Sequence, residues 1–410
     1  MFTKSDAELK KMGADITTRE IQQQPSLWKE TFKIYQEKKQ EIDKFLAKIN
    51  QKFNKVKVIF TGAGTSAYVG NTVMPYLRKH ADRTKYDFEA IDTTKIVSTP
   101  EDYLEAETPT ILVSFARSGN SPESVATVEL AKQLVTNLYQ IAITCAPEGH
   151  LAQDLKDDPN GLVLLMPAKS LDQGFAMTGS FSCMSLATLL VFDTRSDAEK
   201  ETIVNEIAKM GESVVDREAE IQKLVDTDFD RITYIGSGAL GGLAEEARLK
   251  ILELTAGKVA ALFDTSMGLR HGPKSFLDKK TIVFDFVSNN SYTRKYDLDI
   301  LDEIKADEIV PLVMGVGQLK KGQDKEWWFT AKRAVMGVGQ LKKGQDFDGK
   351  FFAFSGEELP DAYLALPDIM FGQTIALLTS VKVGNTPDTP SPTGTVNRVV
   401  KGVTIHKFIK

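Results

Sequence analysis

The sequence has little of several features that would narrow its function at once. Its 410 residues include two cysteines, Cys145 and Cys183, too few and too far apart for a disulfide framework or a thiolate metal site. No run approaches the ~20 apolar residues of a membrane span. Residues 1–13 lack the apolar stretch of a secretory signal. We therefore expect a cytoplasmic protein with two buried cysteines, no metal and no membrane partner.

Positive charge is also scarce. The chain has 51 Lys and Arg against 56 Asp and Glu, a formal net charge of -5. Because a nucleic-acid surface is normally basic, we exclude nucleic acid as a partner. A small phosphorylated molecule remains compatible, since one local nest of donors binds one phosphate whatever the global charge. With 42% hydrophobic residues, the length favours two globular domains.

The hydrophobic pattern predicts a helical arm followed by two α/β domains. Residues 1–50 carry apolar side chains near helical spacing. Beyond them, short β-branched runs alternate with helical stretches, and several runs lack apolar–polar alternation, as in parallel strands covered on both faces. Expected strands are 56–62, 87–92, 110–116, 138–144, 162–167, 232–237, 258–263 and 281–287. We predict doubly wound parallel sheets flanked by helices in domains 51–215 and 216–385, then a tail, 386–410.

One segment occurs twice without change: VMGVGQLKKGQD spans 313–324 and again 335–346. Diverged structural repeats are rarely identical, and solenoid arrays need at least three copies to bury a continuous core. We interpret the repeat as a recent duplication or a sequence error in a surface region. Neither the repeat nor Trp327 and Trp328 between its copies is assigned a function.

A glycine-rich loop follows the first predicted strand. GAGTSAYVG, residues 62–70, leads directly into a helix. Glycine permits a sharp turn there, so the first N–H groups of the helix and the hydroxyls of Thr65 and Ser66 can face an anion. A tight strand-to-helix connection needs glycine regardless, so this loop alone is a weak signal.

A second loop, ARSGNSPES at 116–124, follows the strand 110–116 in the same way. Capping of the next helix by Ser121 would use one hydroxyl, and the surplus at Ser118 and Ser124 favours an anion site. Ligands of open α/β sheets bind where such loops converge at the carboxyl ends of strands. Neither loop matches a dinucleotide fingerprint or a Walker loop, so we expect a monophosphate and no cofactor.

These two loops resemble those of the sugar isomerase (SIS) domain, and two such domains in tandem resemble the isomerase half of glucosamine-6-phosphate synthase. Other strings resemble the galactosamine-6-phosphate deaminase/isomerase family, also called tagatose-6-phosphate ketose/aldose isomerases. They are TTREIQQQPSLW at 17–28, RHGPKSFLDKKT at 270–281, YTRKYDLD at 292–299 and GNTPDTPSPTGTVNRVVKGVTI at 384–405. The resemblance covers nearly the whole chain. It implies two tandem SIS domains and a homodimer or higher homo-oligomer.

The resemblance also implies which residues bind a sugar phosphate. The serines of the two loops would hold the phosphate, and Thr178 and Ser180 would line the side of the sugar hydroxyls. Arg117 stands where the synthase carries a glutamine that touches the substrate. The full set of expected substrate-binding residues is Thr65, Ser66, Arg117, Ser118, Ser121, Thr178, Ser180 and Lys250.

A catalytic set can be proposed on the same basis. Isomerisation needs a base that moves a proton from C2 to C1 and groups that open the ring. Lys250 and Glu253 stand three residues apart and share one helix face, although by pattern alone a solvated salt bridge is the commoner explanation. The resemblance implies that Glu253 is the base and Lys250 a substrate-side cation. It further implies that His271, in RHGPK, opens the ring and that the tail brings Lys401 to the sugar.

The predicted reaction converts galactosamine 6-phosphate to tagatose 6-phosphate and ammonia. Glu253 would remove the C2 proton, reprotonation at C1 would give an imine, and water would hydrolyse it. The synthase's glutaminase domain is absent, which favours release of ammonia. Two alternatives stay open: a plain aldose–ketose isomerase of a hexose 6-phosphate, and a sensor that binds sugar phosphate without turnover. Glu253, His271 and the lack of a basic headpiece argue against the sensor.

Overall fold

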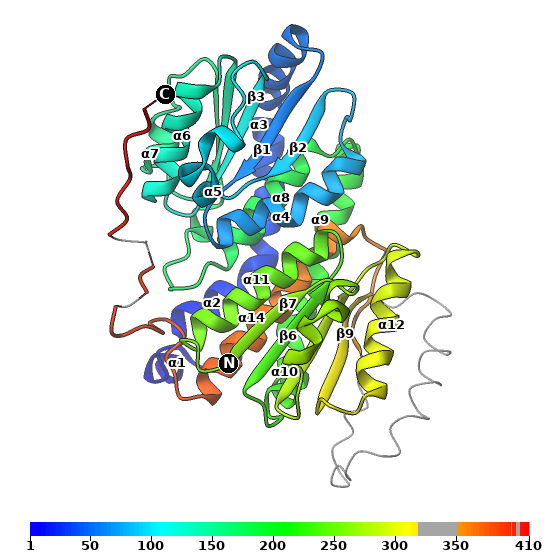
Figure 1. The fold of residues 1–410 in the computed structure, drawn as a ribbon. Coiled ribbons are helices and arrows are strands. Elements are labelled where there is room, and N and C mark those ends of the chain that lie inside the picture. Colours follow the sequence, from blue (N-terminus) through cyan, green and yellow to red (C-terminus); the bar gives the residue numbers. More distant parts are fainter. Residues whose placement is uncertain (319–350, 395, 399–401, 410) are drawn as a thin grey trace. The chain divides into compact units, whose positions relative to one another are not determined.

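The computed structural model describes residues 1–318, 351–394, 396–398 and 402–409 (Figure 1). These residues form two compact units. The first unit comprises Arg19–Ala208 and Ser391–Lys410, and the second comprises Met1–Thr18 and Lys209–Pro390. The expected arm at 1–50 is helical, but its residues are shared between the two units.

The first unit contains a five-stranded parallel sheet in the order β2-β1-β3-β4-β5. Its strands are β1 (Val56–Thr61), β2 (Tyr86–Ala90), β3 (Thr110–Ala116), β4 (Leu138–Thr144) and β5 (Gly161–Leu165). The strands β1 and β3 are hydrogen-bonded neighbours, with Thr61 opposite Ser114. The loops that follow these two strands therefore leave the same edge of the sheet.

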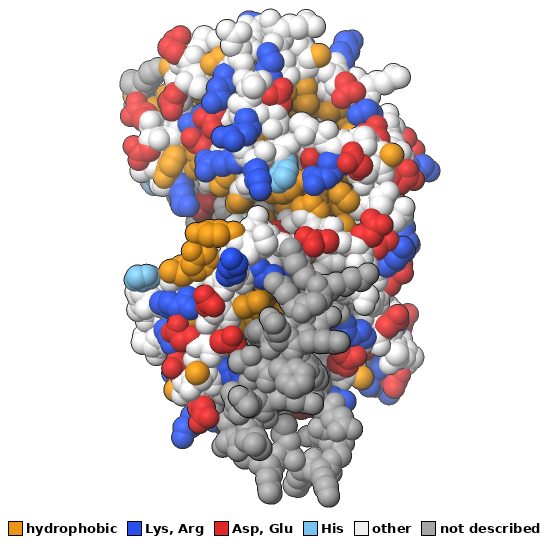
Figure 2. Space-filling view, turned by 90° about the vertical axis from the view of Figure 1, so that its right-hand side faces the viewer, with side chains coloured by type: hydrophobic (Ala, Val, Ile, Leu, Met, Phe, Trp, Pro, Cys, Tyr) orange, Lys and Arg blue, Asp and Glu red, His pale blue; other side chains and the backbone are white. Residues whose placement is uncertain are grey.

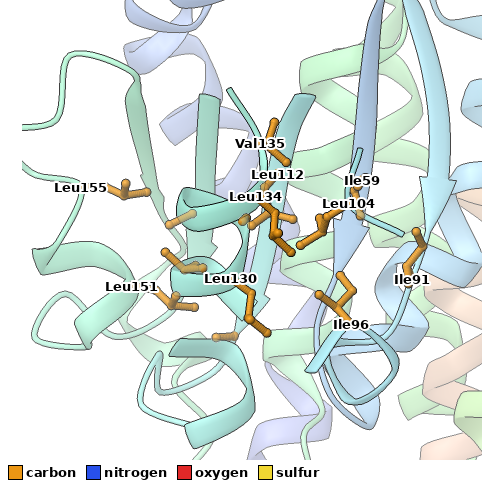
Figure 3. Close-up of a cluster of buried hydrophobic side chains, with 14 residues drawn as sticks. Ile59, Ile91, Ile96, Leu104, Leu112, Leu130, Leu134, Val135, Leu151 and Leu155 are labelled. Atoms are coloured by element: carbon orange, nitrogen blue, oxygen red, sulfur yellow. The ribbon is translucent and has the colours of Figure 1, made fainter. Parts of the chain in front are cut away.

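Helices cover both faces of this sheet. On one face, α5, α6 and α7 enclose a cluster that includes Ile59 and Leu112 of the sheet, Leu134 and Leu151 (Figure 3). On the other face, Phe60 stacks on Phe88 with their ring centroids 5.5 Å apart. The helices are α3 (Gln24–Lys52), α4 (Thr65–His80), α5 (Thr93–Ser98), α6 (Pro122–Leu134), α7 (His150–Gln153) and α8 (Gly179–Phe192), with short 3-10 turns η1 (Pro100–Asp102) and η2 (Ala168–Ser170).

The second unit repeats this plan, with a parallel sheet in the order β10-β9-β8-β6-β7. Its strands are β6 (Arg231–Gly236), β7 (Ala260–Asp264), β8 (Thr281–Val287), β9 (Leu312–Gln318) and β10 (Phe351–Phe354). The predicted pair of doubly wound parallel sheets is thereby confirmed. Remaining elements are α1 (Asp6–Lys11), α2 (Asp15–Gln22), α9 (Asp197–Asp216), α10 (Glu218–Val225), α11 (Ala239–Leu254), η3 (Gly268–His271), η4 (Pro273–Phe276), α12 (Thr293–Ala306) and α14 (Asp361–Lys382).

The duplicated segment was expected at the surface, and for the start of its first copy this was wrong. Residues 313–318 belong to β9, which lies between β8 and β10 and is buried from Met314 onward. Gly315 is required there, because a Cβ atom would lie 2.6 Å from the ring of Phe351. Residues 319–324 and 335–346, with Trp327 and Trp328, lie outside the described residues.

Two general expectations can be compared with the described residues. Cys145 and Cys183 are free and buried, as expected, and burial raises the pKa of the Cys145 thiol to about 12. The expectation that no run approaches a membrane span was wrong for α14, which has the length and apolarity of one, but 94% of its apolar window is buried, as in a core helix. On the face drawn in Figure 2, basic and acidic side chains are interspersed.

Candidate functional site

The loop between β1 and α4 is shaped by two glycines. Gly64 has a φ of +56°, a left-handed conformation that favours glycine. At Gly62, a Cβ atom would lie 2.6 Å from the backbone carbonyl carbon of Ser66. This turn places Thr65 and Ser66 in the first turn of α4, where helix N–H groups favour an anion.

The loop between β3 and α6 presents a second helix start at the same edge of the sheet. Gly119 has a φ of +70°, and the N–H of Asn120 donates to Ser118 Oγ at 3.4 Å. Ser121 occupies the N-cap position of α6, with Pro122 following, yet its hydroxyl makes no capping hydrogen bond. Capping therefore does not account for this hydroxyl.

Arg117, at the end of β3, points into the first unit. Its side chain is 6% exposed and donates to the carbonyl oxygens of Gly174 (3.3 Å) and Phe175 (3.2 Å). A third bond, of 2.7 Å, goes to the carbonyl oxygen of Arg398 in the C-terminal tail. Arg117 thus joins three segments of the first unit.

Thr178 and Ser180, expected near the sugar, surround a carboxylate that the sequence analysis missed. Asp172 is fully buried and accepts hydrogen bonds from Thr178 Oγ1 (2.9 Å) and Ser180 Oγ (2.5 Å). The backbone N–H groups of Thr178, Gly179 and Ser180 also donate to it. Both hydroxyls therefore help Asp172 to cap α8, and their expected contact with the sugar stays a prediction.

Glu20 is a second buried carboxyl group that the sequence analysis missed. It accepts hydrogen bonds from the backbone N–H groups of Gln173 and Gly174. Burial, with the nearby charge of Asp172, raises the pKa of Glu20 to about 8. The segment 172–178 is thus held by Glu20, Asp172 and Arg117, and its Met177 sulfur lies 3.9 Å from Ser66 Oγ.

In the second unit, the predicted Lys250–Glu253 pair is present on α11. Lys250 Nζ lies 2.5 Å from Glu253 Oε2 and 3.3 Å from Glu246 Oε1. Lys250 is 0% exposed, which excludes a solvated salt bridge, whereas the Glu253 side chain is 21% exposed. Burial alone would lower the pKa of Lys250, but the two carboxylates outweigh it and raise that pKa. Lys250 is therefore a buried, charged support for a carboxylate that reaches the surface.

The remaining predicted catalytic residues are less defined. His271 ends η3 with an exposed side chain that makes no hydrogen bond or ion pair with the described residues. Gly272 beside it has a φ of +122°. Lys401 lies outside the described residues. No group of three His, Cys, Asp or Glu side chains within the described ranges could hold a metal ion.

In the second unit, the loop that corresponds to 62–64 has a glycine in the same left-handed conformation but different residues around it. Gly238 has a φ of +60°, and Ala239 and Leu240 replace the hydroxyl residues that begin α4. The carboxylate of Asp297, from α12, accepts hydrogen bonds from Ser237 Oγ (2.9 Å), Ser266 Oγ and the N–H of Ser288 (2.9 Å). A buried carboxylate of the chain itself is therefore bound beside this loop by Ser237, Ser266 and Ser288.

Known proteins share the sequence and the fold that carry these loops. A family model described as "SIS domain" matches residues 53–192. The chain is 38% identical over 408 residues to the D-galactosamine-6-phosphate deaminase AgaS of Shewanella sp. ANA-3, covering 99% of this chain and 95% of that protein. The crystal structure of tagatose-6-phosphate ketose/aldose isomerase from Escherichia coli superposes with a TM-score of 0.81 at 36% identity, covering 96% of each chain.

A more distant structure shares the fold alone. The C-terminal domain of glucosamine-fructose-6-phosphate aminotransferase from Francisella tularensis superposes with a TM-score of 0.70 at 17% identity. It covers 91% of this chain, and 98% of that chain is matched. The tandem arrangement of sheets therefore persists where the sequence similarity is low.

Proposed function

Because the chain belongs to the galactosamine-6-phosphate deaminase family, we propose that it converts galactosamine 6-phosphate to tagatose 6-phosphate and ammonia. The observation that carries this proposal is the carboxylate of Glu253, which reaches the surface while the buried Lys250 holds it at 2.5 Å. A carboxylate fixed by a buried cation is a general base of defined geometry.

In this proposal the first unit holds the phosphate of the substrate. Thr65, Ser66, Ser118 and Ser121 donate to it, together with the backbone N–H groups that begin α4 and α6. Support comes from Gly64, whose left-handed conformation opens the start of α4. The hydroxyl of Ser121, which makes no capping bond, supports the same role.

Glu253 carries out the proton transfer. After the ring opens, its carboxylate removes the proton from C2 of the aldehyde form, and the electron pair is delocalised into the C1 carbonyl. Return of the proton to C1 gives an imine at C2, and water then releases ammonia and leaves the ketose. Lys250 stays buried and positions Glu253, because its ammonium group already contacts Glu253 and Glu246.

Further parts of the proposal rest on family membership. His271 assists ring opening, and its exposed side chain is available for this role. Lys401 in the tail contacts the sugar. The enzyme acts in the cytoplasm as a homodimer, with His271 serving the site of the neighbouring copy. A plain hexose-6-phosphate isomerase is the second candidate, because the Escherichia coli structure is named a tagatose-6-phosphate ketose/aldose isomerase and the two reactions share the C2 proton transfer.

The test measures ammonia and ketose formation from galactosamine 6-phosphate, glucosamine 6-phosphate and galactose 6-phosphate. We expect ammonia from the galactosamine substrate, lost in Glu253→Gln and kept in Glu37→Gln, a substitution at an exposed glutamate of α3. Ketose from galactose 6-phosphate without ammonia from either amino sugar would instead establish the plain isomerase. Retained binding of all three without product would contradict an enzymatic role.

A further inference from the structure

The C-terminal tail of the first unit is attached to the segment 172–175 through two arginines. Arg117 donates to the carbonyl oxygen of Arg398, while the guanidinium of Arg398 donates back to the carbonyl oxygen of Asp172. Arg117 thus binds the backbone of Arg398, and Arg398 binds the backbone of the segment that Arg117 also holds. We call these two residues, with the carbonyl groups they bind, the arginine clasp.

The chemistry of Arg117 suits a clasp of backbone groups. A guanidinium presents five N–H donors in a rigid fork, so one side chain can bind several carbonyl oxygens at fixed positions. Arg117 binds those of Gly174, Phe175 and Arg398 while only 6% exposed. Glu20 secures the same segment by accepting from the N–H groups of Gln173 and Gly174.

The tail has a second attachment in the same unit. Phe408 packs against the hydrophobic cluster that includes Leu151 and Leu155. The exposed Val403 and Ile405 between the two attachments are not part of this packing. On the tail side, Phe408 is half-buried and Arg398 is exposed, so the buried part of the arginine clasp is the Arg117 side chain.

The clasp also lies beside both candidate phosphate loops. Arg117 directly precedes Ser118, so a ligand that fixes this loop also fixes the start of the Arg117 side chain. The segment bound by Arg117 carries Met177, whose sulfur is 3.9 Å from Ser66 Oγ. Both loops are thereby connected, through one buried side chain, to the tail.

We propose that Arg117 is a positioning residue that couples occupation of the serine loops to docking of the C-terminal tail, and that it does not itself bind substrate. The proposal rests on the proposed function only in taking Ser118 as a phosphate ligand. Anion binding orders the loop, the ordered loop holds Arg117, and Arg117 holds the tail at Arg398. Lysine cannot replace it, because a single ammonium cannot reach three carbonyl groups in fork geometry.

The test is amide hydrogen–deuterium exchange of the full chain, with and without inorganic phosphate, together with steady-state kinetics. In the wild type, phosphate should slow exchange in the tail. In Arg117→Ala and Arg117→Lys, tail exchange should rise about tenfold or more and no longer respond to phosphate. kcat should fall by a similar factor, whereas the dissociation constant for phosphate should change less than about threefold. Arg83→Ala, at an exposed arginine, is the matched control.

Two results would overturn the proposal. Unchanged tail exchange in Arg117→Ala would show that the clasp does not hold the tail. Unchanged tail exchange with weaker phosphate binding would make Arg117 a direct ligand. If Arg117→Ala does not fold, Arg398→Ala tests the same clasp, since it removes the bond to Asp172 and should loosen the tail likewise. The exchange measurement needs no turnover, so it is independent of the proposed reaction. If phosphate protects the tail amides from exchange but the chain is inactive on every sugar, the clasp proposal stands and the proposed reaction is rejected.

Discussion

Lys250→Met removes a buried cation from between two carboxylates, and we expect it to lower the free energy of unfolding by about 3–5 kcal/mol. Lys250 and Glu246 are both 0% exposed. Methionine keeps most of the side-chain volume, so the loss comes mainly from separating the buried carboxylate of Glu246 from its ammonium partner and little from a cavity. As the matched control, Lys132→Met breaks the exposed i,i+3 pair with Glu129 and should cost less than about 1 kcal/mol.

The pH dependence gives this prediction a second check. The raised pKa of Lys250 means that its contribution is fully present below the unfolded pKa and is lost only as the pH rises through the folded value. Between pH 5 and 8 the wild-type lysine therefore stays charged. In the variant, the buried carboxyl group is penalised only when ionised, so the deficit should be larger at pH 8 than at pH 5.

The assay is denaturant unfolding followed by far-UV circular dichroism at both pH values. Glu246→Gln in the Lys250→Met background should recover much of the loss, because it removes the buried negative charge that Lys250 balances in the wild type. A loss below about 1 kcal/mol in Lys250→Met, or one independent of pH, would refute a buried charged support for Glu253.

Two further predictions follow from the loops of the two units. Ser121→Ala should weaken phosphate binding about tenfold while changing the free energy of unfolding by less than about 0.5 kcal/mol, because the Ser121 hydroxyl makes no capping bond. Calorimetric titration and thermal unfolding would check this. A loss of stability without a change in affinity would contradict it. Asp297→Ala should lower the free energy of unfolding by about 2 kcal/mol. Acetate or phosphate should restore part of this loss, because a small anion can take the place of the carboxylate between Ser237, Ser266 and Ser288. Asp297→Asn, which fills the space, should show no such rescue in thermal unfolding.

The strands could be predicted where both their faces are buried, because such strands read as continuous apolar runs. The strand β8, TIVFDFV, is buried at every position and was predicted within its bounds. The strand β9 was missed, because Gly315 and Gly317 lower strand propensity and lie in the duplicated segment. Contact with Phe351 makes glycine necessary at Gly315, and that contact is not visible in the local sequence.

In the candidate site, too, the parts that depend on local interactions could be predicted and those that depend on distant contacts could not. The glycine loops and the Lys250–Glu253 pair depend on neighbours within a few residues, so sequence spacing was sufficient to predict them. The full burial of Lys250 depends on tertiary packing of α11 and was not predictable from spacing. Glu20 binds Gln173 across 153 positions, and Arg117 binds Arg398 across 281. No periodicity or motif links such partners, so the clasp emerges only in the fold.

The most direct test of the central claim, that Glu253 moves the proton from C2 to C1, follows the hydrogen itself. Galactosamine 6-phosphate deuterated at C2 would be supplied in ordinary water, and the product analysed by nuclear magnetic resonance. We predict a primary isotope effect on ammonia release, tagatose 6-phosphate that carries transferred deuterium at C1, and no such product from Glu253→Gln. Ammonia release with the deuterium still on C2 would contradict proton abstraction and with it the role of Glu253.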